Sequence, residues 1–146
     1  MTALLLIQRR ACLALAAAPL LASTGAHAQI ANVTGAELQA MKLRSEGVTI
    51  DFPPLADTGF SVPLYAELVA PAGKKIESIE VFLPANPNTR AVKLRLMEPQ
   101  ASYAFTTRLR LAGSQDAWVV ATLTDGSRIG ASAPTVITSS ACFDGS

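Results

Sequence analysis

From residue 48 onward, apolar and polar positions alternate in short runs that end at glycine, proline, asparagine or aspartate. Within 92–96, for example, apolar side chains alternate with Lys93 and Arg95, which predicts a strand with one dry face and one wet face. The predicted strands span 48–52, 61–69, 76–83, 92–96, 103–111, 118–124 and 128–137. Their spacing of roughly ten residues is typical of an all-β fold, an immunoglobulin-like antiparallel β-sandwich.

A helical pattern precedes these strands. Thr34 is followed three residues later by Glu37, which is the spacing of a capping box, and Leu38 and Met41 give the segment an apolar side. The sequence therefore predicts a short N-terminal helix within 29–47 that ends near Gly47. Its pattern leaves open whether this helix joins the main core, whereas Trp118 in a nearly continuous apolar strand is expected to pack there.

Residues 1–28 have the pattern of a signal peptide. Arg9 and Arg10 precede an apolar run over 11–21, and a small-x-small motif ends at Ala28. The run is shorter than the roughly 20 apolar residues that a spanning helix needs, so we expect cleavage after Ala28 and no membrane segment in the mature chain. The paired arginines favour the twin-arginine route over general secretion, and they predict a periplasmic protein.

Removal of this leader changes the charge and the available chemistry. The full chain carries 12 basic and 11 acidic residues, so loss of two arginines leaves 10 basic residues and no basic stripe for nucleic acid. Arg108 and Arg110 fall on one predicted strand face and are expected to be solvated. The only histidine, His27, leaves with the leader, which removes any Ser-His or Cys-His pair and any imidazole ligand. We therefore expect no catalytic residues, no metal site and no cofactor.

Cys142 is the only cysteine outside the leader, since Cys12 lies within it. It belongs to the segment 139–146, Ser-Ser-Ala-Cys-Phe-Asp-Gly-Ser, whose small residues predict a flexible C-terminal arm. Five peptide steps from Ile137 reach about 17 Å at full extension, so the thiol can enter a cavity of another protein. With an ordinary pKa of ~8.5, it is partly thiolate at neutral pH. We interpret Cys142 as a covalent attachment point.

Other interpretations of the arm stay open. In a periplasmic immunoglobulin-like structural or assembly module, Cys142 is idle or forms an intermolecular disulfide with a partner. Phe143 can also pack on the sandwich and tie the tail down, which would count against a freely moving arm.

The segment 48–137 resembles SoxY, the sulfur-carrier subunit of the SoxYZ complex of bacterial sulfur oxidation. The likeness rests on the order of three motifs ahead of a strand that leads to a cysteine: Asn86-Pro87-Asn88, Thr107-Arg108-Leu109-Arg110-Leu111-Ala112 and Ala121-Thr122-Leu123-Thr124-Asp125-Gly126-Ser127. The resemblance implies an immunoglobulin-like fold and a SoxZ-like subunit in a heterodimer. It also implies that intermediates of thiosulfate or sulfide oxidation are bound to Cys142 and processed by Sox enzymes, so the chain itself is a non-catalytic carrier.

The arm departs from the family pattern, in which the cysteine lies within Gly-Gly-Cys-Gly-Gly. Here Ala141 precedes Cys142, and Phe143 and Asp144 follow it, so the arm is thicker and more negative than a glycine arm. The domain organisation we predict is a signal peptide (1–28), a helical segment (29–47), a sandwich (48–138) and a cysteine arm (139–146). The sequence leaves open which sulfur species is carried, whether family enzymes accept this arm and which edge strand binds the partner.

Overall fold

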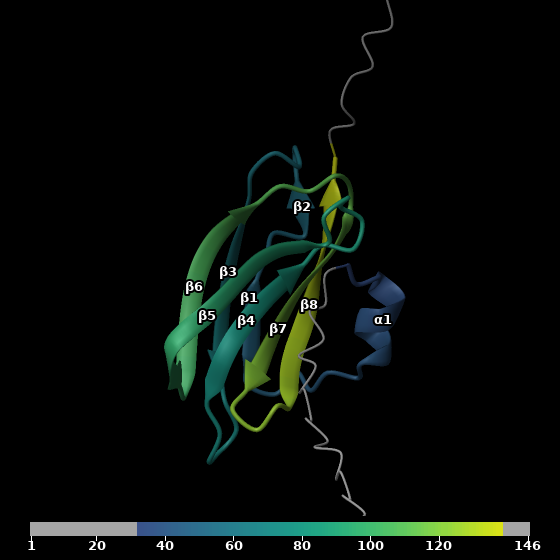
Figure 1. The fold of residues 1–146 in the computed structure, drawn as a ribbon. Helices are drawn as coiled ribbons and strands as arrows, with labels where there is room; N and C mark the ends of the chain where they lie inside the picture. The colour runs from purple at the N-terminus through teal and green to yellow at the C-terminus, as the bar shows by residue number, and fades with distance from the viewer. Residues whose placement is uncertain (1–31, 139–146) are drawn as a thin grey trace, which may run out of the picture.

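The structure is a computed structural model that describes residues 32–138, so the predicted signal peptide and Cys142 lie outside the described residues. Within this range the chain forms one helix and eight strands that build two sheets (Figure 1). The elements are α1 (Gly35–Ala40), β1 (Val48–Asp51), β2 (Leu55–Ala56), β3 (Val62–Val69), β4 (Ile76–Phe82), β5 (Arg90–Gln100), β6 (Ser102–Leu109), β7 (Gln115–Leu123) and β8 (Arg128–Ile137). One sheet has the order β1-β3-β6, and the other has the order β2-β8-β7-β4-β5.

The two sheets pack face to face around one apolar core, as the alternating pattern predicts. In β3, every second side chain is buried, from Val62 to Leu68, while the residues between them are exposed. The longest inward rows on the facing sheet come from β4 and β7, which pair antiparallel. The prediction of an all-β immunoglobulin-like sandwich is confirmed.

One strand was not predicted from the sequence. β2 has only two residues, too few to alternate, and it pairs parallel with the end of β8 through Leu55 opposite Val136 and Ala56 opposite Ile137. The described sandwich therefore has eight strands where the sequence predicted seven. The short strand follows Pro53 and Pro54, which interrupt pairing after β1.

The helix α1 begins as predicted and ends earlier. Thr34 caps it through a hydrogen bond from the Glu37 backbone N–H, and the Glu37 carboxylate accepts from the Thr34 N–H at 2.7 Å. The helix stops at Ala40 and not near Gly47, because Lys42 adopts a left-handed conformation with φ of 44°.

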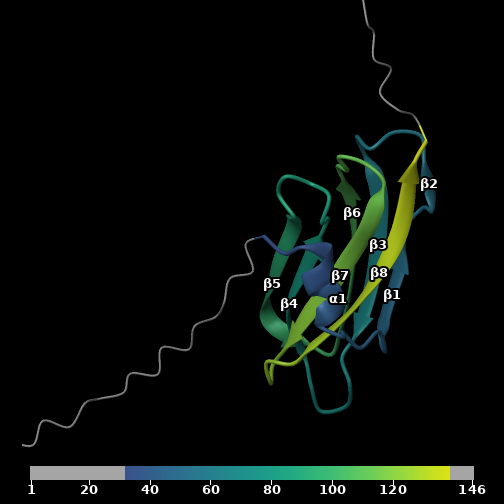
Figure 2. The same ribbon diagram turned by 90° about the vertical axis from the view of Figure 1, so that its right-hand side faces the viewer.

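This helix covers the outer face of the five-stranded sheet (Figure 2). Leu38 is fully buried there against Phe82 and Val120, in a second apolar cluster separate from the core between the sheets. Trp118 packs against this second cluster, so the expectation that it lies in the main core was wrong. On β7 its side chain points outward, because the inward positions are the odd-numbered neighbours Ala117 and Val119.

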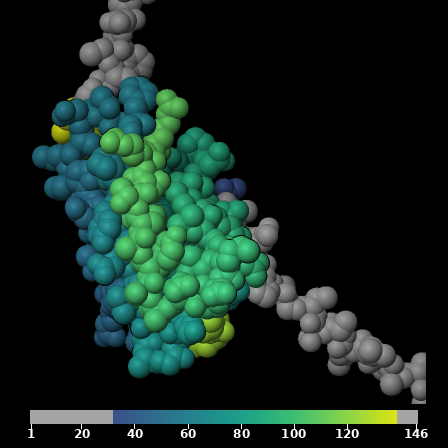
Figure 3. Space-filling model, turned by 90° about the vertical axis from the view of Figure 1, so that its left-hand side faces the viewer, coloured from purple at the N-terminus to yellow at the C-terminus, as the bar shows by residue number. Residues whose placement is uncertain are grey.

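Along one flank of the sandwich the inward side chains are only partly buried. β5 is the outer strand of one sheet and β6 the outer strand of the other, and the two strands lie side by side on this flank (Figure 3). Their inward side chains are only partly buried, although they pack on the core: Val92, Leu94, Leu96, Tyr103 and Phe105. We call these five residues the open flank.

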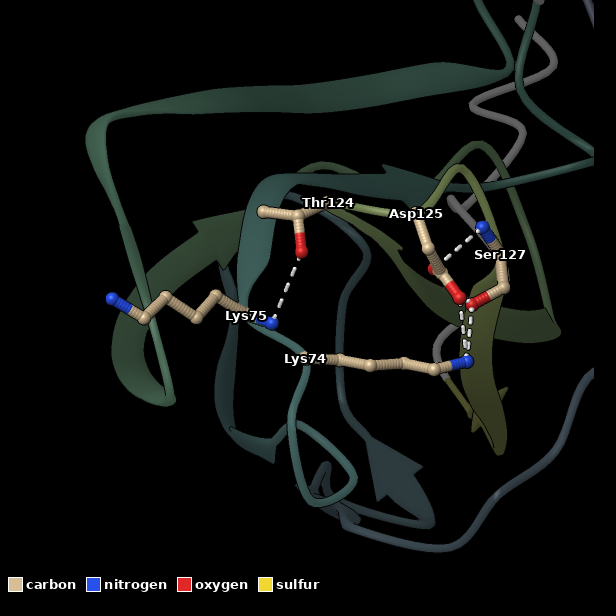
Figure 4. Close-up of polar contacts among 5 residues, drawn as sticks. All are labelled: Lys74, Lys75, Thr124, Asp125 and Ser127. Atoms are coloured by element: carbon tan, nitrogen blue, oxygen red, sulfur yellow. Dashed lines mark hydrogen bonds and ion pairs between the residues drawn. The ribbon is translucent and has the colours of Figure 1, made fainter.

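The β7–β8 hairpin closes the opposite end of the molecule from the last residue of β8 (Figure 1). As predicted, Asp125-Gly126 forms its turn, with Gly126 at φ of 80°. The Asp125 carboxylate lies 2.6 Å from the Lys74 ammonium and accepts hydrogen bonds from Ser127 (Figure 4). The contact with Lys74, and then those with Ser127, hold the pKa of Asp125 well below its usual range. Among the described residues, no helix is long and apolar enough to cross a membrane.

Candidate functional site

The segment that leads to Cys142 leaves the sandwich at a well-defined point. Backbone N–H groups at the end of β8 are bound on both sides: Val136 donates to the Pro54 carbonyl, Ile137 to the Ser114 hydroxyl and Thr138 to the Ala56 carbonyl, each at 2.9 Å. The chain is therefore held up to Thr138, and the predicted arm begins directly after it.

Cys142 itself lies outside the described residues, as does the rest of the segment 139–146. Four peptide steps separate it from Thr138, which allows at most about 14 Å from that anchor. The structure thus defines the root of the arm, and the surroundings of the root decide what the arm can meet on its own protein.

A cavity of about 470 Å³ adjoins this root. We call the surrounding end of the sandwich the arm end. The cavity is lined by Thr58, Gly59, Phe60, Asn86, Pro87, Arg110, Leu111, Ala112, Gly113 and Ile137. Apolar surface predominates in this lining, and among the described residues that form it Arg110 alone is ionisable.

An aromatic ring and a guanidinium form one wall of the cavity. The Phe60 side chain is 70% exposed, and the Arg110 guanidinium lies over its ring at 5.3 Å from the centroid. This distance is within the range of a cation–π contact, which at an exposed site contributes about 0.5–1 kcal/mol. β6 ends at Leu109, before Arg110, so the prediction that Arg108 and Arg110 share a strand face was wrong.

Asn86 ties together the loops that form this end. Its Nδ2 donates to the Arg110 carbonyl at 2.7 Å, and its Oδ1 accepts from the Ala112 N–H and from Gln115 Nε2, both at 2.8 Å. Gln115 in turn accepts from the Ala85 N–H at 2.8 Å. The β4–β5 loop is thereby fixed to the β6–β7 loop, and both form walls of the cavity.

Gly59 fixes the third wall through a close backbone approach. The Leu111 N–H donates to the Gly59 carbonyl at 2.8 Å, and a Cβ on Gly59 would lie 2.3 Å from the Leu111 carbonyl oxygen. Any side chain at this position would therefore push the β2–β3 loop away from the β6–β7 loop. Neither this contact nor the exposure of Phe60 had a signal in the sequence pattern, because each depends on residues about fifty positions apart.

The three motifs that suggested a family resemblance occupy different ends of the molecule. Asn86-Pro87-Asn88 and the end of the segment 107–112 meet at the arm end, where Asn86, Pro87 and Arg110 line the cavity. The segment 121–127 forms the hairpin at the opposite end (Figure 1). Within the described range 32–138, no group of three or more His, Cys, Asp or Glu side chains is placed to hold a metal ion.

Comparison with protein families gives a match over most of the chain. The family described as sulfur oxidation protein SoxY matches residues 30–142, a range that includes the described sandwich and ends at Cys142. The chain belongs to the SoxY family. The resemblance drawn from the motifs is thereby confirmed.

Solved structures support the fold of this SoxY-family chain. The sulfur carrier protein SoxY from Chlorobium limicola f thiosulfatophilum is 23% identical, with a TM-score of 0.57, over 66% of this chain and 83% of that one. A variant of superoxide reductase (neelaredoxin) from Ignicoccus hospitalis is 13% identical, with a TM-score of 0.50, over 70% of this chain and 87% of that one. At these identities the likeness concerns the fold alone. A comparison with curated proteins gives no match.

Proposed function

We propose that this SoxY-family chain is a covalent carrier of sulfur intermediates, with Cys142 as the attachment point and with no catalytic residues of its own. The observation that carries the proposal is the position of the arm root. β8 is held by hydrogen bonds up to Thr138, at one end of the sandwich, and Cys142 follows only four residues later. In this role the sandwich is the docking body, and the arm presents the sulfur to partner enzymes.

The chemistry of this role needs a partner enzyme. When the Cys142 thiolate is joined to the outer sulfur of thiosulfate, one S–S bond forms and two electrons are released to the loading oxidoreductase. The thiolate is the reactive form, and an exposed cysteine with an ordinary pKa supplies a small fraction of it at neutral pH. We therefore propose that the loading enzyme activates the sulfur within its own site.

Intact mass of the mature protein tests carriage. From cells that oxidise sulfur compounds, the wild-type chain is expected to carry adducts of sulfur or thiosulfate mass that reductant removes. Cys142→Ser is expected to carry none while it keeps the wild-type urea midpoint, and Ser140→Ala in the same arm serves as the control that retains the adduct. A clean mass for the wild-type chain, or an adduct of protein size, would favour a structural module with an idle or disulfide-bonded Cys142.

We further propose a heterodimer with a SoxZ-like subunit that covers the open flank. Family membership supports such a partner, and the flank supplies a reason, because its five inward apolar side chains remain partly exposed between two unpaired edge strands. Edge strands in small sandwiches are usually covered or blunted.

A surface substitution tests this interface without disturbing the core. A partner that covers the edge of β5 also meets Met97, which directly follows Leu96 of the open flank and is fully exposed. Met97→Asp is therefore expected to leave the fold intact and to weaken the heterodimer by about tenfold or more, since a charge in an apolar interface is costly. Thr49→Asp on β1, at the other edge of the three-stranded sheet, is the control. Equal affinity of both variants in titration calorimetry would place the partner elsewhere.

The compartment follows from the leader. We propose export to the periplasm by the twin-arginine route, with Gln29 as the first mature residue. N-terminal sequencing of the periplasmic form checks the cleavage site, and retention of a double Arg9→Lys, Arg10→Lys variant in the cytoplasm checks the route.

A further inference from the structure

The cavity at the arm end lies directly beside the point where the described chain stops. Ile137 is part of its lining, and Thr138 is the last described residue. Phe60, which also lines the cavity, is a large apolar residue that is 70% exposed. An apolar wall therefore lies within reach of the segment that follows residue 138.

The segment 139–146 contains one large apolar side chain, Phe143. It lies five residues beyond Thr138, a distance that reaches about 17 Å at full extension. The cavity wall begins at the residue before Thr138, so a much shorter path is enough and the chain has the slack to turn back. The small residues Ser139, Ser140 and Ala141 between them allow such a turn without crowding the root.

Charge favours the same occupant. Asp144 follows Phe143 directly, and the one ionisable side chain that the described part of the chain contributes to the cavity is Arg110, which is exposed beside Phe60. The cavity volume of about 470 Å³ falls within the range of about 300–1,000 Å³ that is usual for small-ligand sites, so it accommodates a phenyl ring together with the adjacent carboxylate.

We propose that this cavity is a resting seat for the chain's own arm, in which the Phe143 ring lies against Phe60 and Leu111 while Asp144 pairs with Arg110. The role of the seat rests on the proposed carrier function: it holds Cys142 beside the sandwich between visits to partner enzymes. A short flexible tether supplies an effective concentration in the millimolar range, so even a weak contact fills the seat for much of the time and still releases quickly. A seated arm is thus compatible with carriage.

Nuclear magnetic resonance of the mature, ¹⁵N-labelled protein tests the seat. Phe143→Ala is expected to shift the backbone amide signals of Gly59, Leu111 and Gly113, and to leave those of Gly73 and Gly126 at the hairpin end unchanged. Ser140→Ala in the same arm is the matched control, with little effect at the cavity. Unchanged cavity amides in Phe143→Ala would overturn the proposal, as would shifts spread over the whole sandwich.

Alkylation of Cys142 by iodoacetamide provides an independent readout. If the seat is filled between half and four-fifths of the time, Phe143→Ala raises the rate by about two- to fivefold. Phe60→Ala is expected to raise it equally, and the double variant no further, because both remove the same contact. Additive effects, or an unchanged rate in both single variants, would contradict the seat. Shifts that grow with protein concentration would assign the ring to a second copy and also overturn it.

The two proposals can fail separately. A wild-type chain without sulfur adducts whose cavity amides nevertheless respond to Phe143→Ala loses the carrier role and keeps the seat. A chain with adducts but without that response keeps the carrier role and loses the seat.

Discussion

Among the residues of the arm end, Asn86 is expected to contribute most to the stability of the fold. Its amide makes three hydrogen bonds, to the Arg110 carbonyl, the Ala112 N–H and the Gln115 side chain. A typical intramolecular hydrogen bond contributes about 0.5–1.5 kcal/mol, and the low half of that range applies here because these groups are near water. Asn86→Ala is therefore expected to lower the free energy of unfolding by about 1.5–3 kcal/mol.

Urea unfolding of the mature protein, followed by the fluorescence of the single tryptophan, Trp118, measures this loss. With a slope of about 2 kcal/mol per molar urea, the midpoint should fall by about 1 M. Asn88→Ala, two residues further along the same loop and exposed, is the matched control and should stay within about 0.5 kcal/mol of wild type. Equal midpoints for the two variants would refute the inference that Asn86 holds the loops together.

The hairpin end and one tight turn give two further predictions. Lys74 lowers the pKa of Asp125, so the contribution of this carboxylate to stability is present above the ordinary aspartate pKa of about 3.9 and is lost as the pH falls below it. Asp125→Asn should therefore reduce the loss of stability at acid pH, measured by urea titrations at several pH values. An unchanged acid dependence would contradict the ion pair. Gly47→Ala should destabilise the protein far more than Gly73→Ala. Both glycines have positive φ, but of the two only Gly47 is so placed that a Cβ would collide with a backbone atom, the Val69 carbonyl oxygen. Equal unfolding midpoints for the two variants would contradict that packing.

Features that depend on neighbours in sequence were predictable. The bounds of β8 agree with the prediction, and the capping box of Thr34 and Glu37 is present. β5 extends from Arg90 to Gln100, well beyond the predicted 92–96, because its last four residues are all exposed on an edge and so carry no alternation. A pattern of burial can mark a strand only where burial alternates.

Features that depend on distant contacts were not predictable. β2 exists because Leu55 and Ala56 meet the end of β8, about eighty residues away. The cavity at the arm end is formed by loops between different strand pairs, so no spacing in the sequence brings Phe60 and Arg110 together. Even so, Asn86 belongs to one of the three motifs that indicated the family, and its side chain connects those loops.

β8 is an inner strand of its sheet, with β2 on one side and β7 on the other. In the proposed carrier role, a partner enzyme that draws the arm into its active site would pull on the end of this strand. The ladder hydrogen bonds run across that axis, so the load is shared in shear by the whole ladder and cannot open it one rung at a time. The fold therefore resists force well along β8, the direction in which a partner enzyme would pull the arm.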